Sequence, residues 1–416
     1  MSDHHTTNYI PENQHNDDLF DNNTILTDTH LNDVGLNPPN FYNSKLSKPI
    51  AYLRNLLLPL IHFELPLLQK IQSYQNHNLI NLYFLWTANL GSHTFYVIML
   101  PLPVWLGSIN LSRDLVIVLG LGVYFTGVIK DLLCLPRPSS PPLKRLTMSH
   151  YTSKEYGCPS SHSANATSVS MILFLHTFNN NSFSPIIKYL IYSFFTWYWF
   201  TLIFGRIYCG MHGLVDISLG ILVGIFTVSF RLALKPIWDF ILLSPKSNLS
   251  FLTPPILSSI YYSIIYFHPI PIEQCPCFED SVAFIAVLLG FDLSYWSLKP
   301  SNLNSKYSSL DLNQLYLLSP AKINYDYSKL GITFTILRIL IGILSVITWK
   351  TISKPLFTSI INKLRYGSSL SPKSSTNPCF AYIPRSDTKI IVKYIVYSGI
   401  PTIAIYSMYI FKFLNI

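Results

Sequence analysis

Long apolar segments separated by short polar ones recur from residue 79 to the end of the chain. These segments cover approximately residues 79–107, 114–135, 162–178, 186–208, 212–233, 253–269, 279–298, 329–351 and 390–411. Several of them approach or exceed the length of about 20 residues that a helix needs to cross a bilayer. The pattern therefore predicts an all-α fold, built as a polytopic bundle of membrane helices.

The chain before residue 79 departs from this pattern. Residues 1–47 are polar, rich in Asn and Asp and without helical periodicity, which predicts a disordered tail. Residues 49–72 are apolar but interrupted by charges and prolines, which suits a helix lying in the membrane interface better than a span. The interrupting residues are Arg54, Pro59, Glu64, Pro66 and Lys70. We expect a tail at 1–47, a core at 48–235 that includes the interfacial helix 49–72, and a C-terminal transmembrane extension at 236–416.

The composition agrees with a membrane protein. Half of the residues are hydrophobic, 12% are charged and the mean hydropathy is +0.33, whereas soluble domains are about one quarter charged. The 27 Tyr and 7 Trp residues suit the membrane interface. The formal net charge of +9 fits contact with anionic membrane lipids and with phosphate. Binding of nucleic acid would need a concentrated basic stripe, and the sequence has none.

Three polar clusters lie at the ends of apolar segments between residues 130 and 216. The first contains Lys130 and Arg137, the second is Ser160-Ser161-His162, and the third contains Arg206, His212 and Asp216. Segments 114–135 and 186–208 end at clusters, whereas 162–178 and 212–233 begin at them. Alternating helices therefore bring all three clusters to one membrane face. Because ionisable groups near a bilayer are costly, they usually serve a site, and we expect 48–235 to be the catalytic core.

The basic residues and the serines suit the binding of phosphate. Arg offers planar forked donors and Lys a point charge, so Lys130, Arg137 and Arg206 are candidates to neutralise phosphate oxygens. The alternative is that basic residues at helix ends reach for lipid headgroups. Ser160 and Ser161 precede an apolar helix, whose N-terminal N–H groups form an anion site. The alternative for these serines is helix capping, and both roles are compatible.

The histidines suit catalysis of phosphoryl transfer. His212 and Asp216 are four residues apart, so on a helix they share one face. A carboxylate that accepts from one imidazole nitrogen fixes the tautomer and makes the other nitrogen a better nucleophile. The alternative is a polar pair that faces the bundle interior. His162, in the first turn of its helix, is placed to give a proton to a leaving alkoxide.

The cysteines do not predict a metal site or any other cofactor. Cys275-Pro-Cys277 is too tightly spaced for a zinc ribbon, and the sequence has no second cysteine pair that would complete such a site. Each of the three polar clusters has a cysteine beside it in the sequence: Cys134, Cys158 and Cys209. If the clusters come together, these cysteines could approach one another. We interpret them as free structural thiols.

Together the motifs resemble the tripartite signature of the type 2 phosphatidic acid phosphatase superfamily: Lys-x6-Arg-Pro, Pro-Ser-x-His and Arg-x5-His-x3-Asp. The resemblance implies an all-α membrane bundle with a six-helix catalytic core. It implies a phosphohistidine at His212, a general acid at His162, assistance from Asp216 and hydrolysis without a metal. Phosphate binding then falls to Lys130, Arg137, Ser160, Ser161 and Arg206. Ser161 stands where the family usually has Gly, and Gly205 where it usually has Ser; neither change removes a catalytic group.

The flanking sequence is similar to a narrower group, the fungal long-chain base 1-phosphate phosphatases and the animal sphingosine 1-phosphate phosphatases. The similar segments are Ala88-Asn-Leu-Gly-Ser-His-Thr-Phe95, Lys130-Asp-Leu-Leu-Cys-Leu-Pro-Arg-Pro138 and Tyr208-Cys-Gly-Met-His-Gly213. The resemblance implies a sphingoid base 1-phosphate as substrate and a multi-pass protein of the endoplasmic reticulum with a lumenal site. Two alternatives stay open: a phospholipid-head transferase of the inositol phosphorylceramide synthase type, which shares the catalytic triad, and a membrane transporter with an anion site.

Overall fold

The computed structural model describes residues 26–27, 33–73, 78–148, 154–243, 250–273, 275–298, 325–366 and 388–416. The N-terminal half contains α1 (Pro39–Lys45), α2 (Lys48–Phe63), α3 (Leu65–Gln72), α4 (Asn78–Ala88), η1 (Asn89–Gly91), α5 (His93–Met99), α6 (Leu102–Trp105), α7 (Ile109–Leu133), α9 (Ser161–Asn179) and α10 (Pro185–Tyr208). The C-terminal half contains α11 (Leu214–Leu243), η2 (Ser250–Leu252), α12 (Thr253–Tyr266), α13 (Cys277–Ser297), α15 (Tyr327–Tyr366) and α16 (Thr388–Phe413). Two-residue strands β1 (Leu26–Thr27) and β2 (Leu146–Thr147) pair antiparallel. The expected all-α class is confirmed.

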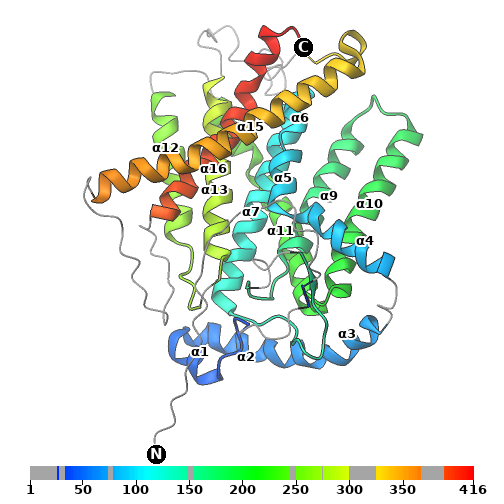
Figure 1. The fold of residues 1–416 in the computed structure, drawn as a ribbon, viewed down its shortest axis with the longest axis vertical. Coiled ribbons are helices and arrows are strands. Elements are labelled where there is room, and N and C mark those ends of the chain that lie inside the picture. The colour runs from blue at the N-terminus through cyan, green and yellow to red at the C-terminus, as the bar shows by residue number, and fades with distance from the viewer. Residues whose placement is uncertain are drawn as a thin grey trace, which may run out of the picture.

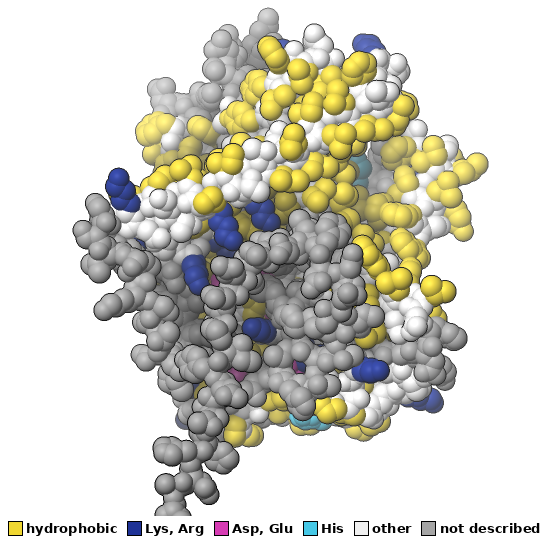
Figure 2. Space-filling model, viewed as in Figure 1, with side chains coloured by type: hydrophobic (Ala, Val, Ile, Leu, Met, Phe, Trp, Pro, Cys, Tyr) yellow, Lys and Arg dark blue, Asp and Glu magenta, His cyan; other side chains and the backbone are white. Residues whose placement is uncertain are grey.

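The helices form one bundle, with α7 near its middle and α9 and α10 on one side (Figure 1). Helix α9 packs against α7, α10 and α11, and α13 joins α7 to α16. Among the described residues, five helices are long and apolar enough to cross a membrane. They are α7, α10, residues 214–239 of α11, α15 and α16. Hydrophobic side chains cover much of the upper part of the face in Figure 2, as expected of a multi-pass membrane protein.

The expected first span at 79–107 is wrong, because the structure breaks it into α4, η1, α5 and α6. Helix α4 ends at Ala88, and after the short η1 a new helix, α5, begins with Ser92 as its N-cap. The Ser92 hydroxyl caps α5 by accepting the N–H of Phe95 at 3.2 Å. Pro101 and Pro103 then limit helix continuation, since proline lacks the N–H that an α-helix uses. Apolar composition alone did not reveal these breaks.

The expected unstructured tail does not extend over residues 33–47, which include α1. Tyr42 on α1 is completely buried, and the guanidinium of Arg54 on α2 lies 3.6 Å from its ring centroid. Arg54 also donates to the carbonyl of Gly35 at 2.9 Å. These contacts hold residues 33–47 against α2. Residues 1–25 and 28–32 of the expected tail lie outside the described residues.

The expected interfacial segment 49–72 forms α2 and α3, which lie with α1 across one end of the bundle (Figure 1). Helix α7 ends there and α9 begins there, so this end holds the three polar clusters. The expected boundary between 235 and 236 falls inside α11, which continues through Pro236 to Leu243. Residues of α13 share a hydrophobic cluster with Val116 and Ile117 of α7. The C-terminal helices therefore pack directly on the proposed catalytic core.

Candidate active site

The structure brings the three sequence clusters together at one end of the bundle. Lys130 lies in the last turn of α7 and Arg137 in the following loop. Arg206 lies in the last turn of α10, and Asp216 lies in the first turn of α11. The start of α9 is tied to α11 by a backbone hydrogen bond from Ser160 N–H to the Asp216 carbonyl, at 2.9 Å.

The three basic side chains are buried rather than directed to water. Lys130, Arg137 and Arg206 are only 2%, 3% and 6% exposed. Side chains that merely reach for lipid headgroups would keep their charge in water, so burial favours a site. Among the described contacts, none satisfies the buried Nε of Arg206. An unpaired buried donor is costly, and a bound phosphate oxygen would satisfy it.

Arg137 is held in a fixed orientation by backbone carbonyls. Its Nε donates to the carbonyl of Glu155 at 3.0 Å, and its Nη1 donates to the carbonyl of Met211 at 2.7 Å. Burial lowers the pKa of Arg137 to about 10; Arg206 and Arg145 act in the same direction, whereas Glu155 opposes them. The guanidinium therefore stays charged at neutral pH. Its position is set before any ligand arrives.

His212 faces Asp216 with one ring nitrogen and Arg137 with the other. Nδ1 lies 3.4 Å from Oδ2 of Asp216, and Nε2 lies 3.0 Å from Nη1 of Arg137. Asp216 Oδ2 also accepts the N–H of Gly213 at 3.0 Å, which holds the carboxylate in place. This arrangement puts the proton on Nδ1 and leaves the Nε2 lone pair directed at the cations. Nε2 is thus the atom available for nucleophilic attack.

Electrostatics keep the His212 imidazole neutral. Burial lowers the pKa of His212 well below its usual value, and the charges of Arg137, Arg206 and Lys130 act in the same direction. A neutral imidazole retains the lone pair that a nucleophile needs. The cations that would bind phosphate therefore also prepare the histidine.

A tight turn brings His212 back to the end of α10. The Arg206 carbonyl accepts the N–H groups of both Met211, at 3.0 Å, and His212, at 3.3 Å. Gly210 makes the turn possible because its φ of +65° is a left-handed value that other residues rarely adopt. The turn places the histidine beside the arginine of the same cluster.

His162 and the two serines occupy the start of α9. Ser160 is the N-cap: its Oγ accepts the N–H of Ser163 at 3.4 Å and the Ser163 hydroxyl at 3.1 Å. The capping interpretation of Ser160 is therefore correct, and it leaves the phosphate role of Ser160 and Ser161 as a prediction. His162 is half-buried and close enough to His212 for its charge to lower the pKa of that residue.

Gly91 packs against His162, although no sequence motif identifies it as part of the site. A Cβ placed on Gly91 would lie 2.5 Å from Cδ2 of the His162 ring and 3.3 Å from its Nε2. Only glycine lets η1 approach the imidazole this closely. The segment 88–95 had carried a family resemblance without a stated role, and this contact supplies one. Gly205 has a comparable packing reason, since a Cβ there would lie 3.0 Å from Phe84 on α4.

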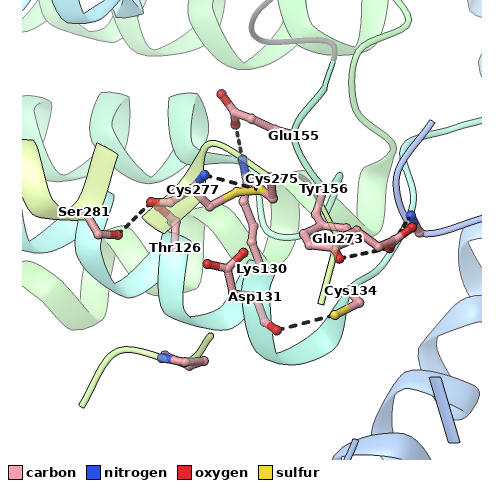
Figure 3. Close-up of a disulfide and its surroundings, with 12 residues drawn as sticks. Thr126, Lys130, Asp131, Cys134, Glu155, Tyr156, Glu273, Cys275, Cys277 and Ser281 are labelled. Atoms are coloured by element: carbon pink, nitrogen blue, oxygen red, sulfur yellow. Dashed lines mark hydrogen bonds and ion pairs between the residues drawn. A yellow bond between two sulfur atoms is a disulfide. The ribbon is translucent and has the colours of Figure 1, made fainter. Parts of the chain in front are cut away.

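Two acidic residues of the site were also missed. Glu155 forms an ion pair with Lys130, with 2.5 Å between Oε2 and Nζ (Figure 3). Glu64 accepts the N–H of Val215 at 3.1 Å and so caps α11 next to Asp216. Burial raises the pKa of Glu64, and its hydrogen bonds from Val215 and Leu214 oppose that rise. Neither residue belongs to a motif, and only the fold brings them to the site.

The cysteines fall into two groups. Cys134, Cys158 and Cys209 are buried and free, as expected. Cys275 and Cys277 form a disulfide, which the sequence analysis did not predict. Their sulfurs lie within 4.8 Å of a carboxylate oxygen of Asp131, near the Lys130 end of α7 (Figure 3). Because both sulfurs are bonded to each other, they are not thiolate ligands for a metal.

A buried histidine–aspartate pair beside three buried cations, at one end of a membrane helix bundle, defines the class of membrane-embedded phosphatases. The PAP2 superfamily profile matches residues 112–237, which contain all eight predicted site residues. The chain belongs to the PAP2 superfamily.

The chain is similar over most of its length to two fungal proteins. It is 38% identical to dihydrosphingosine 1-phosphate phosphatase YSR3 of Saccharomyces cerevisiae, over 89% of each chain. It is 36% identical to a dihydrosphingosine 1-phosphate phosphatase of Schizosaccharomyces pombe, over 82% of this chain and 80% of the relative. Sphingosine-1-phosphate phosphatase 2 of Mus musculus is 31% identical over 51% of this chain and 57% of its own. No solved structure matches the chain.

Proposed function

We propose that this protein hydrolyses sphingoid base 1-phosphates, such as dihydrosphingosine or phytosphingosine 1-phosphate, through a phosphohistidine on His212. The observation that carries the mechanism is the placement of His212, with Nδ1 3.4 Å from Asp216 and Nε2 directed at the cation of Arg137. A nucleophile oriented by a carboxylate and surrounded by phosphate-binding cations suits attack on a phosphate monoester.

The first step transfers the phosphoryl group to the enzyme. Nε2 of His212 attacks phosphorus, the bond from phosphorus to the ester oxygen breaks, and the leaving alkoxide takes a proton from His162. Lys130, Arg137 and Arg206 hold the phosphoryl oxygens, where charge builds up in the transition state. In the second step His162 removes a proton from water, the water oxygen attacks phosphorus, and the bond to Nε2 breaks to release inorganic phosphate.

The substrate class is supported by the relatives. Two fungal proteins that align with more than four fifths of this chain are dihydrosphingosine 1-phosphate phosphatases by name. Their names favour water as the acceptor over the alcohol that a head-group transferase would use. The buried histidine–aspartate pair favours an enzyme over a transporter, because a passive anion site needs no oriented nucleophile.

The location of the site is part of the proposal. The multi-pass helices place the protein in a membrane, and we assign it to the endoplasmic reticulum with the site on the lumenal face. The Cys275–Cys277 disulfide supports this orientation, because it lies near Lys130 at the catalytic end of α7. Disulfides persist in the oxidising lumen and are rare in the cytosol.

Phosphate release by the purified protein tests the substrate class. We expect efficient release from dihydrosphingosine and phytosphingosine 1-phosphates, weak release from phosphatidate and the same rates with EDTA. Equal rates on phosphatidate would contradict the substrate class, and loss of activity with EDTA would contradict the metal-independent chemistry. Chromatography of the lipid product in the presence of added alcohols distinguishes hydrolysis from head-group transfer.

A further inference from the structure

The Glu155 carboxylate occupies the place of an anion among the three basic side chains. Its Oε2 lies 2.5 Å from Nζ of Lys130 and 3.8 Å from Nη2 of Arg137. It also interacts electrostatically with Arg206. Figure 3 shows Lys130 extending from α7 to meet it. The cations that would hold a phosphate are therefore engaged by a carboxylate of the protein itself.

A phosphate and this carboxylate compete for the same cations. Two anions at such short range repel each other strongly in a buried site, so the Glu155 side chain has to turn away when phosphate binds. Its backbone has no such freedom. Arg137 Nε donates to the Glu155 carbonyl at 3.0 Å, and Gly157 N–H donates to the Leu135 carbonyl at 2.9 Å. The displaced carboxylate therefore stays at the edge of the phosphate site.

A carboxylate displaced in this way needs a new cation. The Glu155 side chain is 12% exposed, and leaving such a largely buried polar group without a partner costs about one to two powers of ten in an equilibrium. A sphingoid base 1-phosphate carries its own cation, an ammonium on the carbon next to the one that bears the phosphate. Phosphatidate and lysophosphatidate carry an ester or hydroxyl oxygen there. Only the amine-bearing substrate compensates the carboxylate that its phosphate displaces.

We infer that Glu155 determines specificity for amine-bearing lipid phosphates. Its carboxylate leaves Lys130 and Arg137 when the phosphate binds and then pairs with the substrate ammonium. The inference rests on the proposed function and names the residue that would enforce it. Two other glutamates nearby have other partners. Glu64 accepts the N–H of Val215 at 3.1 Å, and Glu273 accepts the hydroxyls of Tyr42 and Tyr156, each at 2.9 Å. Among the described residues, Glu155 is the carboxylate that forms ion pairs with Lys130 and Arg137.

The test compares two single-chain substrates, dihydrosphingosine 1-phosphate and lysophosphatidate, with wild type, Glu155→Gln and a control. The control is Glu279→Gln, which removes a carboxylate on α13 that pairs with Lys393 of α16 at 3.1 Å and, among the described ion pairs, with none of the three basic residues of the phosphate site. In Glu155→Gln we expect kcat/KM to fall about 10- to 100-fold for the amine substrate, mainly through KM. We expect it to rise for lysophosphatidate, because the competing carboxylate is gone. Glu279→Gln should keep the wild-type ratio.

Inhibition by vanadate gives a second measurement that does not involve an amine. Vanadate occupies a phosphate site, so it should inhibit Glu155→Gln at several-fold lower concentration than wild type. Glu155→Asp, which keeps the charge on a shorter side chain, should retain more of the amine preference than Glu155→Gln does. A stronger amine preference in Glu155→Asp than in Glu155→Gln would distinguish recognition of the substrate charge from a general loss of folding.

Three results would overturn the inference. An equal fall on both substrates would make Glu155 a structural residue. Tighter vanadate inhibition with an unchanged substrate ratio would show that Glu155 competes with phosphate without recognising the amine. Unchanged kinetics and unchanged inhibition would remove it from the site. Failure of the proposed function is distinct, since it would appear in the wild type as absent or non-selective hydrolysis of the amine substrate.

Discussion

Nη1 of Arg137 lies 3.0 Å from Nε2 of His212, so the arginine donates a hydrogen bond to the lone pair that would attack phosphorus. When phosphate binds, a phosphoryl oxygen would accept from this fixed guanidinium in place of Nε2 and so free the nucleophile. Arg137 would therefore link binding of the substrate to activation of the histidine. The fork geometry of the guanidinium is essential to this double role, because a lysine offers only a point charge.

Replacing Arg137 by Lys should lower kcat by about 10²- to 10³-fold, the usual effect of removing one preorganised donor from a developing charge. The measurement is steady-state hydrolysis of dihydrosphingosine 1-phosphate. Arg231→Lys is the matched control, since Arg231 is a buried arginine that pairs with Asp114 at 2.6 Å outside the site. Retention of full activity by Arg137→Lys would contradict the proposed role.

The pH dependence should reflect the lowered pKa of His212. Activity requires the neutral imidazole, so it is present above the pKa of His212 and is lost as the pH falls through it. Burial and the neighbouring cations lower that pKa well below the usual value, which is about 6.5. Arg137→Gln removes one of these cations, so the acid limb of kcat/KM should move to higher pH.

The comparison uses one aryl phosphate for both proteins, because ionisation of the substrate is then identical. Arg231→Gln serves as the control and should leave the limb where it is in the wild type. An acid limb that stays in place or moves to lower pH in Arg137→Gln would show that the limb does not report His212.

His162→Ala should separate the general acid from the nucleophile. An alkoxide is a poor leaving group, so hydrolysis of a sphingoid base 1-phosphate should slow by about 10²- to 10⁴-fold. An aryl phosphate needs no proton on its leaving group and should be hydrolysed much closer to the wild-type rate in the first step. Burst kinetics with both substrates measure this step. Equal losses on the two substrates would exclude His162 as the acid.

Gly91→Ala should resemble a mild form of His162→Ala. The added Cβ would lie 2.5 Å from the imidazole Cδ2, so the ring has to move. We expect slower hydrolysis of alkyl phosphates with aryl phosphates less affected. Gly342→Ala is the control, because its Cβ would lie equally close, 2.5 Å, to the Trp105 ring outside the site. A uniform loss on both substrate types in Gly91→Ala would indicate a packing defect alone.

The lumenal orientation predicts protection of the segment 139–157. An epitope tag in this segment should resist protease in sealed microsomes and be cleaved after detergent is added. A known cytosolic tail and a known lumenal protein in the same vesicles control for their integrity. Cleavage in sealed vesicles would place the site on the cytosolic face and leave its chemistry unchanged.

The sequence predicted the parts of the protein that depend on local pattern. Hydrophobic length placed α7, α9, α10 and most of α11, and the ends of these helices brought His162, Arg206 and His212 to one face. Residues whose roles depend on distant contacts were not predictable. Glu155 gains its role from Lys130 on another element, 25 residues earlier. The broken segment at 79–107 was missed because its prolines and Gly91 lie within a composition that is otherwise apolar.

The most direct test of the account is covalent trapping of phosphate from a radiolabelled sphingoid base 1-phosphate. Rapid alkaline quenching should preserve an acid-labile phosphohistidine on the wild-type protein, and peptide mapping should locate it at His212. The His212→Ala protein should carry no label and show no turnover. Label that persists in His212→Ala, or that maps to any other residue of the wild type, would contradict the proposed nucleophile.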